Sequence, residues 1–195
     1  MTENSNPLGQ YYRQPQIYIK LPSGGRYYPK EVYTPTETGE IPILPMTAKD
    51  EMAFKTPDAM INGQSTVDVI KSCVPNLLDP WKMVNYDTDA VLLAIRIATY
   101  GETMDITFRV PGTEEDQQHS MNLPALLEDI GRIEIADSTT TSKGFKIDIQ
   151  PLDYKTLTKI QIARFEQQKM YGTIDSSSMT EEQKQTAFAK SFETL

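Results

Sequence analysis

The chain has 195 residues, of which 38% are hydrophobic and 24% are charged, a profile typical of a globular protein with one ordinary domain or two small ones. Its net charge is -8, and nonspecific nucleic-acid binding needs clustered Lys and Arg, so nucleic acid is an unlikely partner. No apolar run reaches the length of a membrane span, and no basic-then-apolar signal peptide opens the chain. We therefore expect a protein without a membrane partner that works in the cytosol or in an assembly built there.

Residues 1–16 are polar and contain two prolines. This composition predicts a flexible N-terminal arm that becomes ordered on a partner. Tyr11 and Tyr12 are its only aromatic anchors.

Residues 17–46 form a β-rich segment. The alternation over residues 17–19 predicts a half-buried strand. Glycines predict turns at residues 21–25 and 36–39. Residues 41–46 are extended again, and their two prolines confine them to an edge strand.

Residues 47–101 form a helical core. Thr47 and Asp50 have the spacing of a capping box, which predicts a helix to about Lys55. A second short helix starts at Thr56-Pro57 and stops at Asn62-Gly63. Ser65 begins a third helix, which Pro75 ends.

The strongest helical pattern covers residues 88–100, with Asp87 as its predicted cap. It is apolar almost all round, which predicts a central buried helix. Arg96 is the one charge inside it, and we expect it to pair with a carboxylate at the edge of the core; an anion-binding role is the alternative.

Residues 102–150 form a second β-rich section of hairpins. Alternation over residues 104–110 predicts a strand, followed by an acidic loop at 112–120 and a return strand at 121–123. A short helix is predicted at 124–130, and a further strand around Ile133 and Ile135. A turn at 138–144 then leads to a strand at 145–149, which makes a hairpin with a loop of about seven residues.

Residues 151–195 are predicted as C-terminal helices. The first begins at Asp153 or Thr156 and ends near residues 171–172, and a Ser-rich linker follows at 173–179. Thr180 and Gln183 form a capping box that opens a final helix with Phe188, Phe192 and Leu195 on one stripe. The sequence stops inside this helix, so we expect a longer parent protein or a helix that finishes against a partner.

No constellation of catalytic, cofactor-binding or metal-binding residues is apparent. Cys73 lies in an apolar stretch and is predicted to be a buried structural thiol, far in sequence from the only histidine, His119. One Cys and one His do not make a structural zinc site. The acidic run 114–116 lacks calcium-loop spacing, and Gly24-Gly25 lacks the Lys of a phosphate loop. We therefore predict a non-enzymatic protein without a cofactor.

Surfaces suited to binding other proteins remain. Aromatic side chains are enriched at interfaces, and a helix with a narrow apolar stripe fits a partner groove. The alternative is that each side chain packs on the chain's own core, which is the simpler reading for the tyrosines. The candidate partner-binding residues are Tyr11, Tyr12, Tyr27, Tyr28, Phe188, Phe192 and Leu195.

Several strings resemble one known family. They are LPSGGRYYP at 21–29, GEIPILPMTAKDE at 39–51, KTPDAMING at 55–63, VIKSCVP at 69–75 and AIRIATYG at 94–101. Together they resemble the baseplate hub subunits or hub assembly proteins of T4-like contractile-tailed phages, over residues 7–135. Some similar proteins carry a cysteine pair near residues 110–113; this chain has none there, so a zinc-stabilised hairpin is not carried over.

The resemblance implies a protein made in the host bacterial cytoplasm that takes part in assembly of the virion tail baseplate, and it supplies no catalytic residues. We therefore expect an α+β fold with a central buried helix, and a structural or assembly subunit of the baseplate hub region that acts by protein–protein interaction. Its partners would be other baseplate or tail proteins, with self-association as a further option.

Two other functions stay open. One is a transient assembly chaperone that is absent from the mature virion. The other is a nucleic-acid or ligand-binding module on the β sections, for which the basic and aromatic face would comprise Arg13, Lys20, Arg26 and Lys30 with Tyr18 and Tyr27.

Overall fold

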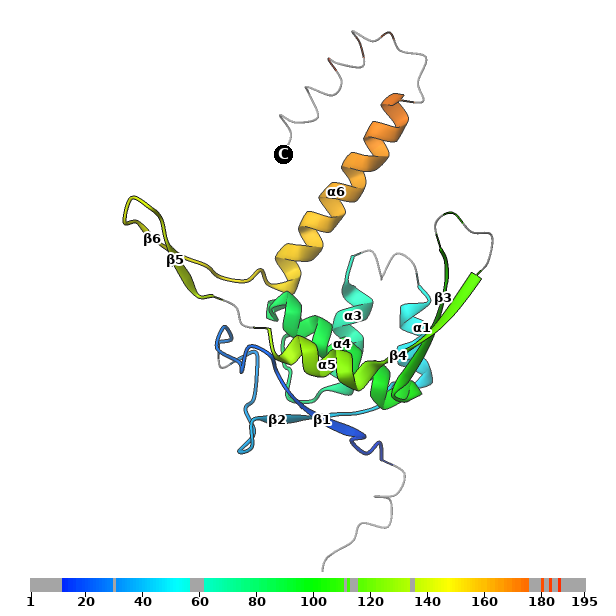
Figure 1. Ribbon diagram of the computed structural model, residues 1–195. Helices are drawn as coiled ribbons and strands as arrows, with labels where there is room; N and C mark the ends of the chain where they lie inside the picture. Colours follow the sequence, from blue (N-terminus) through cyan, green and yellow to red (C-terminus); the bar gives the residue numbers. More distant parts are fainter. Residues whose placement is uncertain are drawn as a thin grey trace, which may run out of the picture. The chain divides into compact units, whose positions relative to one another are not determined.

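The computed structural model describes residues 12–29, 31–56, 62–110, 112, 116–133, 136–175, 180, 183 and 186. The chain divides into two compact units, Met1–Tyr154 and Lys155–Leu195. Figure 1 shows the helices and strands of each. The mixture of helices with small antiparallel strand pairs confirms the predicted α+β class.

The strands of the first unit form three separate two-stranded antiparallel ribbons. They are β1 (Ile17–Lys20) with β2 (Glu40–Ile43), β3 (Thr103–Arg109) with β4 (Asp116–Asn122), and β5 (Ser138–Thr140) with β6 (Lys146–Asp148). The helices are α1 (Ala48–Phe54), α3 (Gln64–Cys73), α4 (Asn85–Tyr100) and α5 (Leu123–Gly131), with a single 3-10 turn, η2 (Pro80–Lys82).

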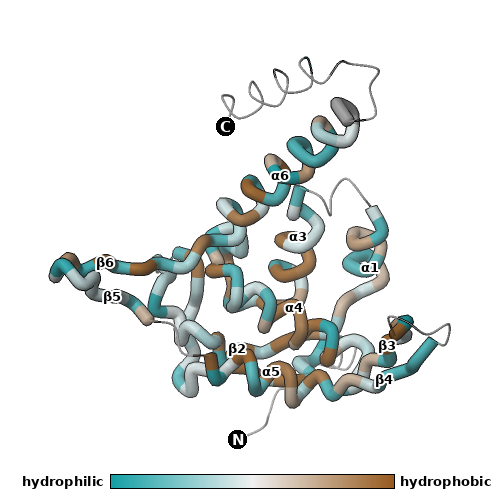
Figure 2. The backbone as a smooth tube through the Cα atoms, turned by 45° about the horizontal axis from the view of Figure 1, so that its top comes forward, coloured by the Kyte–Doolittle hydropathy of each residue, from teal (hydrophilic) through white to brown (hydrophobic). Residues whose placement is uncertain are grey.

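The core is built around α4, as the sequence predicts. Val91, Ala94 and Ile95 are buried on this helix. They belong to one apolar cluster with residues of three other elements, namely Ile19 of β1, Ile41 and Ile43 of β2, and Val69, Ile70 and Cys73 of α3. Figure 2 shows apolar residues along parts of α3 and α4. The predicted central helix is therefore confirmed.

The start of α4 differs from the prediction. Asp87 does not cap the helix, which begins at Asn85 with Val84 as its N-cap residue. The Asp87 carboxylate instead accepts hydrogen bonds from Ser23, more than sixty residues earlier. A tertiary contact has replaced the local role that an Asp near a helix start usually takes.

The α1 and α3 helices follow the prediction at one end or both. The Thr47–Asp50 capping box of α1 is confirmed, and the helix ends at Phe54. Helix α3 ends at Cys73, before Pro75, as predicted, but its start at Ser65 is wrong. Gly63, with φ of 76°, precedes the helix, a backbone conformation that glycine adopts without steric cost. The predicted short helix after Thr56 falls on residues 57–61, outside the described part.

Arg96 does not pair with a carboxylate in the part of the chain that the structure describes. Its guanidinium lies 4.5 Å from the centroid of the Tyr100 ring, one helical turn further on. Residues four apart meet on a helix surface, so a cation–π contact takes the place of the expected ion pair.

The strand bounds of the β3–β4 and β5–β6 ribbons differ from those of the predicted hairpins. Strand β4 starts at Asp116, inside the predicted loop, because main-chain pairing with β3 accepts polar side chains on exposed faces. Strand β5 lies within the predicted turn at 138–144, and Ile133 is in no strand, while Ile135 is outside the described residues. The predicted helix at 124–130 is confirmed as α5.

The second unit contains most of α6 (Tyr154–Asp175), which continues past the predicted end near residue 172. Further on, Gln183 N donates to Thr180 Oγ1 and Thr180 N donates to Gln183 Oε1. These reciprocal bonds confirm the second capping box. None of the described helices combines the length and hydropathy that crossing a bilayer needs.

Candidate functional site

The β5–β6 hairpin carries an apolar face that is largely exposed to solvent in the described part of the chain. Phe145, Ile147 and Ile149 keep 68%, 48% and 44% of their surface exposed. The ladder continues at both ends of the strands, because Thr141 N donates to Phe145 O and Ile149 N donates to Asp137 O. Side chains at alternate positions of a strand point to the same side, so these three form one apolar face. Figure 2 shows apolar residues along β6.

This hairpin has no core of its own. Every residue of β5 and β6 is exposed, and the ribbon has only two strands. Isolated two-stranded hairpins are marginally stable in water, whereas a covered apolar face stabilises them. The hairpin is therefore an element that gains stability when another surface covers Phe145, Ile147 and Ile149.

The base of the hairpin is held by Arg26 and Tyr27 through Asp137. Arg26 Nη1 lies 3.2 Å from Asp137 Oδ2, and the Tyr27 hydroxyl donates to Asp137 Oδ1. This hydrogen bond to a carboxylate, above all, raises the pKa of Tyr27. The ion pair is solvent-exposed and contributes little by itself, so the contacts position the hairpin more than they stabilise the fold.

The turn that supplies Arg26 and Tyr27 is fixed to α4 by a buried carboxylate. Asp87 is fully buried and accepts from Ser23 N at 2.8 Å, from the Ser23 hydroxyl, and from the Tyr28 hydroxyl at 2.6 Å. Burial raises the pKa of Asp87, and the hydrogen bonds from Ser23 and Tyr28 oppose that rise. Burial and the nearby Asp87 likewise raise the pKa of the Tyr28 hydroxyl.

Arg13 fastens the described end of the predicted arm. Its guanidinium donates to Pro45 O at 2.8 Å and to Ser72 O at 2.6 Å, and it lies 3.4 Å from Asp50 Oδ2. Gln16 N also donates to Ile43 O. Residues 13–16 are therefore tied to the core, which leaves Tyr12, 61% exposed, as the last described residue of the arm.

The predicted partner-binding residues differ in exposure and contacts. Tyr12 is exposed, Tyr27 is half-buried and donates to Asp137, and Tyr28 packs against the core, edge-to-face with Tyr33 at 6.4 Å. The remaining candidates lie outside the described residues; they are Tyr11, Phe188, Phe192 and Leu195.

Sequence reasoning missed the hairpin face as a candidate surface. The alternation of Phe145, Ile147 and Ile149 was visible, but alternation alone predicts a half-buried strand and not the absence of a covering layer. Only the tertiary structure reveals that these three side chains remain exposed among the described residues of the first unit.

The described Cys and His side chains lie on different elements. Cys73 is fully buried, and burial raises the pKa of its thiol to about 11. His119 lies on the exposed strand β4, opposite Ile106 of β3. Within the described ranges, no group of three or more His, Cys, Asp or Glu side chains is placed to hold a metal ion.

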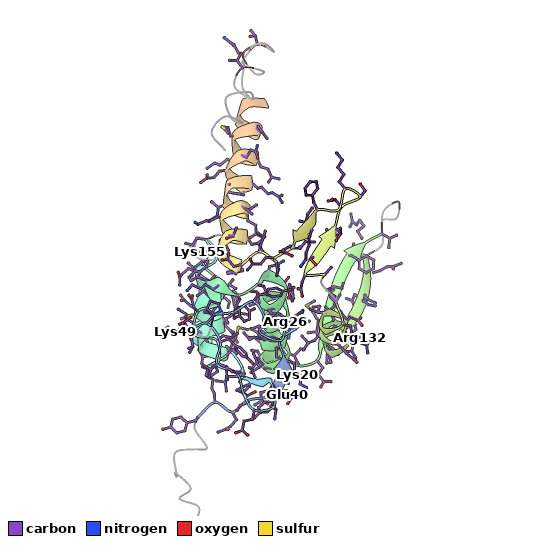
Figure 3. All side chains as sticks on the ribbon, turned by 90° about the vertical axis from the view of Figure 1, so that its left-hand side faces the viewer. Lys20, Arg26, Glu40, Lys49, Arg132 and Lys155 are labelled. Carbon is purple, nitrogen blue, oxygen red and sulfur yellow. The ribbon has the colours of Figure 1, made fainter. Side chains whose placement is uncertain are left out.

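Some of the basic residues that were considered as a nucleic-acid-binding face already contact carboxylates. Arg13 faces Asp50 and Arg26 faces Asp137, so two of the four cations already have a carboxylate close by. Lys20 lies at the end of β1, opposite Glu40 of β2 (Figure 3), and Lys30 is outside the described residues.

Comparison with known families gives one match. The family model described as T4 bacteriophage base plate protein matches residues 14–191. No curated protein and no solved structure matches the chain significantly.

Proposed function

The chain belongs to the T4 bacteriophage base plate protein family, and from this premise we propose that it is a structural or assembly subunit of the hub region of a phage tail baseplate, which acts by binding neighbouring baseplate proteins. Membership supports a role in the virion tail baseplate; the hub location, synthesis in the host cytoplasm and the mode of interaction are our proposal. The matched range contains both the β5–β6 hairpin and helix α6.

The exposed face of Phe145, Ile147 and Ile149 is the observation that carries this proposal. Exposure of three large apolar side chains to water is unfavourable in free energy, and this hairpin has no core of its own that could bury them. Covering the exposed half of each would contribute about 1 kcal/mol per side chain. A partner that covers the face would thereby stabilise the hairpin and gain affinity in the same step.

The test is a three-site variant, Phe145→Ser with Ile147→Ser and Ile149→Ser. Incorporation into baseplates, measured by quantitative mass spectrometry of purified particles, should fall by about tenfold or more, because roughly 3 kcal/mol of apolar contact is removed. The fold should persist, since none of the three belongs to the core cluster.

The matched control lies on the other face of the same strand. Lys146→Ser with Asp148→Ser removes an exposed ion pair of 3.4 Å and should leave incorporation unchanged. Equal incorporation of the wild type and the apolar-face variant would rule out the hairpin as the interface. The same particles separate a resident subunit from a transient chaperone, because a chaperone would be missing from mature virions in the wild type as well.

The sequence candidates at both ends of the chain remain part of the proposal. We propose that Tyr11 and Tyr12 of the arm, and Phe188, Phe192 and Leu195 of the final helix, also contact neighbouring proteins. Tyr12 supports this through its exposure, and the Thr180–Gln183 capping box supports a helix start in front of the terminal stripe.

A further inference from the structure

A groove of about 380 Å³ lies between β1 and α5, apart from the hairpin surface. It is open to solvent, and its size is within the range of sites that bind ligands or peptide segments. All the residues that line it belong to the first unit. The principal ones are Ile17, Tyr18, Ile19 and Lys20 of β1, Ile97 of α4 and Leu127 of α5.

One wall of the groove is the edge of β1. All 4 residues of this strand line it in succession. Successive side chains of a strand point to opposite faces, so a cavity over one face would touch only alternate residues. The groove therefore runs along the edge of the strand, where the main chain is accessible.

This edge has no strand partner. β1 pairs with β2 alone, in a ribbon of two strands, within the described part of the chain. An unpaired edge presents N–H and C=O groups that another extended segment can bond. β1 is thus a template for one further strand.

The opposite wall is a single face of α5. Pro124, Leu127, Glu128 and Gly131 line the groove, at the three- and four-residue spacing of one helical stripe. Leu127 also packs against the core, and Ile97 lies between the two walls as a buried residue. An open strand edge facing an apolar helix face is the arrangement that accepts a peptide by β-strand addition.

Charges distinguish the two sides of the groove. Glu102 and Glu128 lie on the helical side, and Lys20 lies at the end of the strand. Glu128 has an exposed ion pair with Arg132, whereas the described residues provide no ion-pair partner for Glu102. Two carboxylates near an apolar floor favour an occupant that brings a Lys or Arg side chain to this side.

A second copy of the chain does not fit as the occupant through its own β1. In every copy, the free edge of β1 faces that copy's α5 across the groove. Two such edges cannot approach each other without displacing a helix. The groove instead suits one extended segment that is not already part of a sheet.

We propose that this groove binds an extended segment of a partner protein, which adds to β1 as a third strand. The segment carries aliphatic side chains at alternate positions, directed at Ile97 and Leu127, and a basic residue directed at Glu102. It spans about four residues, or roughly 13 Å, to match β1. This inference rests on the proposed function, because it assigns the kind of segment that a baseplate partner contributes.

The test places a photo-crosslinking amino acid, p-benzoylphenylalanine, at Tyr18, which is 61% exposed on the rim. Baseplates assembled with this full-length chain are irradiated, and the crosslinked peptide is sequenced. We expect a partner peptide with aliphatic residues at alternate positions and a neighbouring Lys or Arg. A crosslink to a second copy of this chain, or to a helix of a partner, would overturn the proposal.

Gly131→Trp provides the blocking variant. Gly131 lines the groove, a Cβ there meets nothing within 4 Å and its φ is not left-handed, so we expect the Trp ring to occupy part of the groove. The Tyr18 crosslink should fall by about tenfold or more, because the bound strand would lose its main-chain hydrogen bonds together.

Gly172→Trp is the matched control. Gly172 is also helical, a Cβ there likewise meets nothing within 4 Å, and it belongs to the second unit, which contributes no residue to the lining of the groove. This variant should keep the full crosslink. If Gly131→Trp keeps it too, the groove is not the site. Normal incorporation of the wild type without any Tyr18 crosslink would refute the groove alone, whereas failure of incorporation would refute the proposed function.

Discussion

Asp87 and Asp50 are buried carboxylates that the fold treats in opposite ways. Asp87 accepts hydrogen bonds only from neutral donors, and its burial raises its pKa. Burial also opposes ionisation of Asp50, but hydrogen bonds from Thr47 and Ser72 and the charge of Arg13 outweigh it and lower its pKa. Burial is the largest influence on both carboxyl groups, but it prevails only at Asp87; at Asp50 the hydrogen bonds from Thr47 and Ser72 prevail, with a smaller contribution from Arg13.

Replacing Asp87 by Asn should destabilise the chain at neutral pH. The amide nitrogen cannot accept the hydrogen bonds from Ser23 and Tyr28, so a loss of about 1–3 kcal/mol in the free energy of unfolding is expected in urea titrations. Asp105→Asn, on the exposed side of β3, is the control and should be neutral. Equal stability of wild type and Asp87→Asn would show that the carboxylate does not hold the turn.

The difference in stability between the wild type and Asp87→Asn should depend on pH in one direction. Because the folded-state pKa of Asp87 is raised, its folded form holds the proton more tightly than its unfolded form. The part of the stability that is linked to this proton is present below the unfolded value of about 4 and is lost as the pH rises to the folded value, whereas the hydrogen bonds from Ser23 and Tyr28 also contribute at neutral pH. The stability of wild type minus that of Asp87→Asn should therefore decrease over this window and stay constant above it. A difference that increases with pH would contradict the assignment.

At the scale of elements, the β1–β2 and β5–β6 ribbons differ in the contacts that stabilise them. β1–β2 packs on α3 and α4 through Ile19, Ile41 and Ile43. No residue of β5 or β6 belongs to the described core cluster, and the hairpin is held at its base by the contacts of Arg26 and Tyr27 with Asp137. The elements with a core are expected to open only with the whole unit, whereas the hairpin should open locally.

Limited trypsin digestion tests this difference. Cleavage of the free chain should occur first after Lys143 and Lys146, in and beside the exposed turn of the β5–β6 hairpin. Lys71 in α3 is the internal control and should resist, since this helix is anchored by Val69, Ile70 and Cys73. The hairpin sites should become protected in assembled baseplates. Rapid cleavage there after assembly would be inconsistent with the proposed interface.

At the scale of the whole molecule, the buried core and the proposed C-terminal contact residues belong to different units. Every member of the buried cluster lies between Ile19 and Ile95, inside the first unit. The second unit begins with α6, whose residues are mostly exposed and polar. We therefore expect changes at the C-terminal end of the chain to affect the proposed partner contacts more than the core.

Deleting residues 181–195 should affect incorporation into baseplates but not the stability of the first unit. The melting midpoint of the first unit should change by less than about 4 °C, since the buried cluster of the described residues lies between Ile19 and Ile95. Incorporation into baseplates, or co-purification with baseplate components, should fall because the terminal stripe is absent. An unchanged yield of particles that contain the truncated chain would argue against a role for Phe188, Phe192 and Leu195.

The sequence by itself determined the local features of this protein. The capping boxes at Thr47 and Thr180, the central helix, the end of α3 before Pro75 and the buried Cys73 each depend on residues within a few positions of one another. The family also followed from sequence strings, and the match over residues 14–191 agrees with them. Such features are legible because helix caps, prolines and apolar periodicity act over one or two turns of chain.

Only the tertiary structure decided which surfaces are covered. Asp87 had the sequence position of a cap, yet its carboxylate bonds a turn more than sixty residues away. Phe145, Ile147 and Ile149 had the pattern of a half-buried strand face, yet they remain exposed among the described residues, and the edge of β1 faces α5 across a groove. These outcomes depend on contacts between distant segments, and a periodic pattern specifies which face is apolar but not what lies against it.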